Sequence, residues 1–152
     1  MKKVYGAGQG QSGDVNRDEF QNRSYVLIDI PQTNNFKDNF TSTEVFGAGA
    51  WGGVGMKYTY DDPMADGFDL DRATAVIDLL RGDIKAAYGG SYNEGVTRRT
   101  LVNVPSGSAI KIKKIFGGAY GADYLHPCDV YEAHVEYKLR SEERFSRNAE
   151  TD

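Results

Sequence analysis

The sequence has a single cysteine, Cys128, and no apolar run as long as a membrane span. One cysteine cannot form a disulfide within the chain, so the fold has to be stabilised by side-chain packing. The same count fits a cytoplasmic protein and an exported one. Met1-Lys2-Lys3 looks like the start of a signal peptide, but the apolar stretch that should follow it is missing. We therefore expect no membrane span, and we expect an exported chain to be a segment of a longer protein.

Basic residues are fewer than acidic ones, and histidine is scarce. With 18 Lys and Arg against 22 Asp and Glu, the formal net charge is −4. A general nucleic-acid binder needs a strongly basic surface, so we expect no nucleic-acid partner. Lys111 and Lys113 alternate with isoleucines, which predicts that they and Lys114 line the solvent side of a strand. The 2 histidines offer little material for catalysis.

Glycine and aromatic residues are plentiful. The chain contains 18 glycines, 10 tyrosines and 7 phenylalanines, but only 4 prolines. Many turns and many large aromatic side chains favour an all-β fold. The length of 152 residues is enough for one modest core. We expect one all-β repeat domain over residues 1–138 and a polar tail or cap over residues 139–152.

An aromatic residue followed by glycine recurs along the chain, and we call this the aromatic-glycine signature. Its occurrences are Val4-Tyr5-Gly6-Ala7-Gly8, Val45-Phe46-Gly47-Ala48-Gly49, Ala87-Tyr88-Gly89-Gly90 and Ile115-Phe116-Gly117-Gly118. Successive aromatic residues lie 41, 42 and 28 positions apart. This recurrence predicts a degenerate repeat of strand, corner, strand and glycine turn. Each unit is too small to bury its own apolar face and must stack on the next.

Short apolar and alternating segments predict strands around these signatures. The first strands of successive units are expected at residues 25–31, 74–80, 101–105 and 130–137, and the second strands at 40–46, 82–88 and 109–115. Residues 73–80 also fit a helix, because Ala73, Val76, Ile77 and Leu80 would share one helical face. Comparison with the other units favours a strand there.

Residues 88–108, followed by Ile115-Phe-Gly-Gly-Ala-Tyr-Gly, resemble the large glycine-rich repeat proteins on the surface of anaerobic gut bacteria. The resemblance covers residues 73–137 well and 1–60 loosely, and it departs at Leu139. It implies an exported, structural or adhesive protein with no catalytic residues to carry across. It also implies a right-handed parallel β-helix or a related β-solenoid, and a compact β-sandwich is the alternative architecture.

Aromatic residues in the glycine-flanked turns are the candidate ligand-binding residues. Trp51, Tyr92, Tyr120 and Tyr124 are the ones we select. Aromatic rings stack on sugars and contribute to protein interfaces, so the expected partner is a glycan or a surface protein. The alternative is that each ring closes the core at a corner.

The acidic segment 61–71 is the candidate metal site. Asp62, Asp66, Asp69 and Asp71 could supply oxygen ligands for Ca²⁺, although the segment does not match the EF-hand template. Binding of Ca²⁺ by these aspartates would favour the second hypothesis for the function. This hypothesis is a carbohydrate-active β-helix enzyme, either a lyase or a glycosidase. An exposed acidic loop is the plainer interpretation, and it needs no cofactor.

Two further patterns are weaker. Gly47-x-Gly49-x-x-Gly52 matches the dinucleotide-binding pattern, but a strand-like run follows it where a helix should begin. His126 and Cys128, together with Asp129 and His134, could nominally bind zinc, but their spacing matches no common zinc module.

Stacked units leave strand edges at both ends of the stack. Such edges recruit another chain unless charge, proline or a cap blocks them. We therefore expect contacts with neighbouring repeats or end-to-end self-association. The Glu- and Arg-rich residues 141–150 are a candidate cap.

Overall fold

The computed structural model describes residues 3–7, 23–33, 35–36, 38–51, 53–54, 74–93, 97–121 and 130–138. These residues form a sheet of seven strands and contain no helix. The strands are β1 (Lys3–Tyr5), β2 (Ser24–Asp29), β3 (Glu44–Phe46), β4 (Thr74–Tyr88), β5 (Thr97–Val104), β6 (Ala109–Phe116) and β7 (Val130–Tyr137). The all-β prediction is confirmed, and β4 shows that the segment open to a helical interpretation is a strand.

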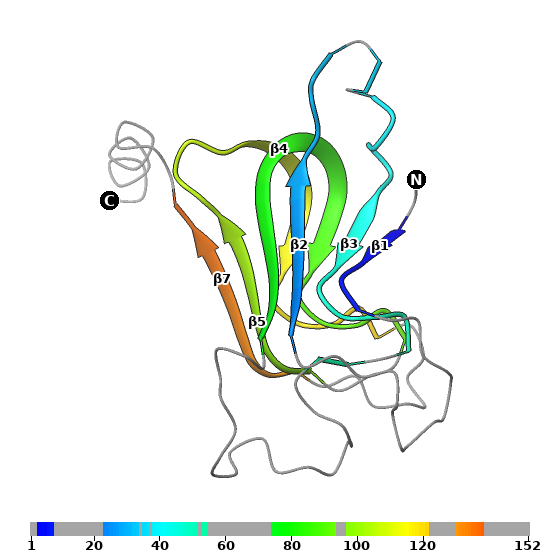
Figure 1. The fold of residues 1–152 in the computed structure, drawn as a ribbon, viewed down its shortest axis with the longest axis vertical. Coiled ribbons are helices and arrows are strands. Elements are labelled where there is room, and N and C mark those ends of the chain that lie inside the picture. Colours follow the sequence, from blue (N-terminus) through cyan, green and yellow to red (C-terminus); the bar gives the residue numbers. More distant parts are fainter. Residues whose placement is uncertain are drawn as a thin grey trace.

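β4 joins two branches of the sheet. Its residues 74–81 pair with β2 and β5, and β7 adds to β5; this is the first branch. Its residues 81–88 pair with β3 and β6, and β1 adds to β3; this is the second branch. Every pair is parallel, and the sheet is not closed. Figure 1 shows β4 bending over at its middle, so that its two halves run in opposite directions.

Gly82 lies in the bend of β4. Its φ of +146° is a conformation that residues with side chains rarely adopt. Two separate strands were expected here, at 74–80 and at 82–88, with Gly82 as the first residue of the second. The structure instead has one bent strand, because glycine lets the backbone change direction while the pairing with β6 continues through Arg81, Gly82 and Asp83.

The apolar core contains inward side chains of both branches. Alternate residues of a strand point to opposite faces, and β2 alternates accordingly between buried and exposed residues. Val26, Ile77 and Val102 stand in register on the first branch. Val45 and Ala87 stand in register on the second branch, in the same core cluster. Parallel pairing therefore places like side chains side by side in the core.

The glycines of the signatures let the second branch turn closely against its neighbours. The amides of Gly6, Gly47 and Gly89 each donate to the carbonyl of the aromatic residue in the next signature, at 2.9 Å. A Cβ on Gly89 would overlap the carbonyl oxygen of Gly117 and lie 2.6 Å from Cβ of Thr100. Each turn thus contacts both the next turn and the first branch, which leaves no room for a side chain.

The bounds of two expected strands differ from the structure. The strand expected at 40–46 begins only at Glu44, because residues 38–42 form turns. In these turns the amide of Thr43 donates to the carbonyl of Phe40 at 2.9 Å. The strand expected at 25–31 ends at Asp29. The strand at 130–137 is confirmed as β7. The tail 139–152 lies outside the described residues.

Candidate functional site

The four aromatic residues of the signatures form one stack across the second branch. Tyr5, Phe46, Tyr88 and Phe116 are register partners from strand to strand. Ring centroids in successive pairs lie 5.4, 5.1 and 5.2 Å apart, with interplanar angles of 23°, 9° and 12°. Their neighbours Val45 and Ala87 belong to the core, so the stack lies on the outer face of the branch.

Two tyrosines from the turns after β4 and β6 cover the middle of this stack. The Tyr92 ring meets Phe46 edge-on, with centroids 5.3 Å apart, and the Tyr120 ring meets Tyr88 in the same way at 5.3 Å. Tyr92 and Tyr120 contact each other with their centroids 5.3 Å apart. Edge-to-face contacts of this kind are a favoured aromatic geometry. They explain why Phe46 is fully buried although it lies on the outer face.

Hydrogen bonds between the stacked turns hold these tyrosines in place. The amide of Tyr92 donates to the carbonyl of Gly49 at 3.1 Å, and the amide of Tyr120 donates to that of Ser91 at 3.0 Å. The backbone that carries each ring is therefore tied to the preceding turn. An aromatic group held in this way loses little conformational entropy when a ligand stacks on it.

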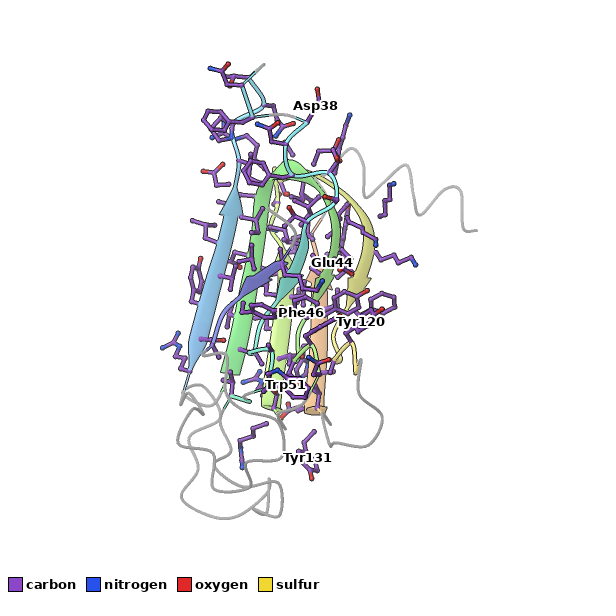
Figure 2. All side chains as sticks on the ribbon, turned by 90° about the vertical axis from the view of Figure 1, so that its right-hand side faces the viewer. Asp38, Glu44, Phe46, Trp51, Tyr120 and Tyr131 are labelled. Atoms are coloured by element: carbon purple, nitrogen blue, oxygen red, sulfur yellow. The ribbon has the colours of Figure 1, made fainter. Side chains whose placement is uncertain are left out.

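Phe116 and Tyr120 make this cluster accessible, because they are 46% and 48% exposed. Tyr5 and Tyr92 are partly buried. We call the outer rings of Tyr5, Tyr92, Phe116 and Tyr120 the aromatic surface. Figure 2 shows Tyr120 and Phe46 at the middle of the molecule, with Glu44 on the same side.

Charged and hydroxyl groups flank the aromatic surface. Lys3 Nζ lies 4.8 Å from the centroid of the Tyr92 ring and 3.9 Å from Glu44 Oε1. Burial raises the pKa of Tyr5, and the nearby Tyr92 and Glu44 add to this. The pKa of Tyr88 is raised by burial first, and then by Glu44 and Tyr120. Both phenols therefore stay protonated at neutral pH and can donate hydrogen bonds.

The structure unites two of the four predicted ligand-binding residues. Tyr92 and Tyr120 belong to the aromatic surface and their rings contact each other, although the two residues lie 28 positions apart in the sequence. Trp51 is partly buried in the segment after β3, and Figure 2 shows it nearer the lower end of the strands than Phe46. Tyr124 lies outside the described residues.

Tyr5 and Phe116 also belong to the site, although neither is among the ligand-binding residues predicted from the sequence. The signal was present, because both are signature aromatics. Units that stack in register bring equivalent residues side by side, so four signatures imply one continuous aromatic row. What could not be inferred is that Phe46 and Tyr88 form a second buried cluster with Ala86, on the face opposite the main core cluster. Nor could it be inferred that Tyr92 and Tyr120 cover this cluster.

The predicted calcium ligands Asp62, Asp66, Asp69 and Asp71 lie outside the described residues. So do His126, Cys128 and Asp129 of the nominal zinc site. In the part of the chain that the structure describes, no group of three or more His, Cys, Asp or Glu could hold a metal ion.

The dinucleotide pattern finds no support in the turn after β3. The amide of Gly47 donates to the carbonyl of Tyr88 at 2.9 Å, and the amide of Ala48 donates to that of Gly90 at 3.2 Å. A phosphate-binding turn needs free amides directed at the ligand. These amides stack one turn on the next instead.

Strand carboxylates on the outer face of the first branch have partners within the protein. Asp78 Oδ1 accepts from Asn103 Nδ2 at 2.9 Å, and Oδ2 accepts from the hydroxyl of Tyr25. Arg81 Nε lies 2.8 Å from Asp29 Oδ1. These contacts link neighbouring strands, which is a structural role.

Comparisons of the chain with protein-family models, curated proteins and solved structures find no match. No helix in the described ranges is long and apolar enough to cross a membrane. Similarity therefore supplies no function, and the proposed function depends on the aromatic surface.

Proposed function

We propose that the chain is an adhesive segment of a right-handed β-solenoid at the cell surface, and that its aromatic surface binds glycans. The observation that carries the proposal is the row of stacked rings that ends in the exposed Phe116 and is covered by the half-exposed Tyr120. Sugar rings present flat C–H faces that stack on aromatic rings, and hydroxyl groups at the edge fix the orientation. The exposed rings supply the stacking area, while Lys3 and Glu44 supply polar contacts at its border.

The parallel, in-register strands support the solenoid part of the proposal. Each aromatic-glycine turn donates a backbone hydrogen bond to the next, as expected where successive coils follow the same path. In such a scaffold every added unit would extend the aromatic row by one ring. A long glycan lying along the row would then contact several rings, and its affinity would grow with the number of units.

Cellohexaose, xylohexaose and chitohexaose are suitable probes, because their flat sugar faces suit stacking. Binding by the full chain would be measured by isothermal titration calorimetry. Tyr120→Ala and Phe116→Ala should weaken binding of the preferred sugar about tenfold each, because each removes one stacking ring.

Phe36→Ala and Tyr131→Ala are the matched controls, because these rings are 45% and 46% exposed and lie outside the aromatic surface. Both control proteins should bind the sugar as the unchanged chain does. Equal losses in all four variants would contradict the proposal, as would the absence of binding to every probe. Binding of a surface protein through the same two residues would leave an adhesin, but not one that recognises glycans.

A further inference from the structure

At each end of the sheet, one branch extends one strand further than the other. At one end, β7 extends the first branch beyond β5, and no described strand extends the second branch beyond β6. At the other end, β1 extends the second branch beyond β3, and no described strand pairs with the outer edge of β2. Each end thus has one overhanging strand, and the overhangs lie on opposite branches. One end therefore has the shape that completes the other.

The β7 end also exposes side chains that would otherwise belong to the core. Val135 and Tyr137 stand in register with Val102 and Val104, which are buried inside. Yet Val135 is 46% exposed and Tyr137 is 53% exposed. At the β2 end, the equivalent Val26 is only 8% exposed. The core is thus open at β7 and covered at β2.

We infer that a second copy of this chain stacks head to tail on the β7 end, with its β2 paired to β7 and its β1 paired to β6. Continuing the registers inside the chain places Ser24 of the second copy opposite Ala133, and its Val26 opposite Val135. Val4 of the second copy then follows Ile115 in the core row of the second branch. The outer edges of β7 and β2, with which no described strand pairs, then gain hydrogen-bond partners, and Val135 is covered.

The same register brings opposite charges together at the start of the β7 contact. Glu132 comes to lie opposite Arg23 of the second copy, one position before the pair of Ser24 and Ala133. On the second branch, Tyr5 of the second copy follows Phe116, so the aromatic stack continues across the junction. The register also places Lys114 beside Lys3 of the second copy. These two like charges lie on the outer face of the second branch, where Glu44 of the second copy already forms an ion pair with its Lys3.

This contact joins two different surfaces, so a further copy can always add. Sedimentation velocity of the full chain over a concentration series should show a mean sedimentation coefficient that rises without levelling off at a dimer. Val135→Asp should weaken association about tenfold or more, because it places a charge in the contact. Phe36→Asp is the matched control, since Phe36 is 45% exposed in a turn outside both edges, and it should associate like the unchanged chain.

A charge reversal at Arg23 tests the register. Arg23→Glu should weaken association by a few-fold, because it places a second carboxylate opposite Glu132, and Arg23→Gln should weaken it less, as expected for an exposed ion pair. Glu132 is left unchanged, because it also contacts His134 and Arg99 within its own chain. A chain that stays monomeric at all concentrations would overturn the inference, because it would mean that the β7 edge is covered within the chain. A plateau at a closed dimer, equal behaviour of Val135→Asp and Phe36→Asp, or equal association of Arg23→Glu and Arg23→Gln would also overturn it.

Discussion

Phe46 and Tyr88 lie 42 residues apart in the sequence, yet they are direct register partners with ring centroids 5.1 Å apart and ring planes within 9° of parallel. The unequal intervals between signatures therefore do not disturb the stack. The excess length lies in the connections. Residues 47–73, between Phe46 and Tyr88, join β3 to β4, whereas residues 89–96 are enough to join β4 to β5.

Replacing Gly89 with alanine should destabilise the protein. The new Cβ would overlap the carbonyl of Gly117 and crowd Thr100, and overpacking of this kind costs about 1–3 kcal/mol in the free energy of unfolding. Gly118→Ala is the control, because its Cβ would have nothing within 4 Å. Urea denaturation of both variants measures the difference. Equal midpoints would show that the turns are not packed as closely as described.

Replacing Phe46 with alanine should cost about 3–5 kcal/mol, because this ring is fully buried between Tyr5, Tyr88, Tyr92 and Tyr120. Phe116→Ala removes the same group from an exposed position, and it should cost much less. Thermal and urea melts of the two variants provide the comparison. If Phe116→Ala proved the more damaging change, the aromatic row would not be covered by Tyr92 and Tyr120.

Much of the fold follows from local patterns in the sequence. The alternation in 110–113 correctly predicts that Ile110 and Ile112 face the core cluster and that Lys111 and Lys113 are exposed. Ile115 reaches the same cluster only because the alternation shifts by one residue at the two consecutive lysines, which the pattern does not predict. The recurring signatures also predict which residues come together, because parallel units stack in register.

Other features depend on contacts between distant residues and could not be predicted. Nothing local distinguishes Gly82, at which one strand bends, from a glycine that ends a strand. Nor does the sequence show that Phe46 and Tyr88 form a second buried cluster on the opposite face, because a buried aromatic residue is ordinarily assigned to the main core. Their burial depends on Tyr92 and Tyr120, whose positions are set by hydrogen bonds to other turns.

Alkaline pH should destabilise the protein through Tyr88. Its pKa is raised above 10.0, chiefly by burial, so the folded state holds the proton more tightly than the unfolded state. Below pH 10 the Tyr88 phenol is protonated in both the folded and the unfolded state, so it does not make the free energy of unfolding depend on pH. Above pH 10 the unfolded state releases the proton more readily, so stability falls as the pH rises. Tyr88→Phe should lose less stability between pH 9 and pH 11 in urea titrations. An equal loss would contradict the burial of this phenol.

Glu132 and His134 on β7 face the basic side chains of β5. His134 Nε2 lies 2.9 Å from Glu132 Oε1, and Arg99 Nε lies 3.8 Å from the same oxygen. The hydrogen bond from His134 is the main cause that holds the pKa of Glu132 below 4.5, and the charges of Arg99, His134 and Arg98 add to it, although burial acts in the opposite direction. This carboxylate thus links β7 to the rest of the first branch while it is ionised.

Glu132→Gln should therefore lower stability at neutral pH and have little effect in acid. A lowered pKa means that the folded state favours the carboxylate, so the stabilisation is complete above the unfolded value near 4.5 and disappears as the pH falls through the lower folded value. Urea melts of the unchanged chain and of Glu132→Gln should differ at pH 6, and the difference should shrink as the pH falls below 4.5. These melts would be measured at a protein concentration at which sedimentation shows only monomer, so that association does not contribute to stability. His134→Ala removes the main hydrogen-bond donor and should reproduce most of the loss at pH 6. A difference that persists unchanged at pH 3 would show that the ionised carboxylate is not what stabilises β7.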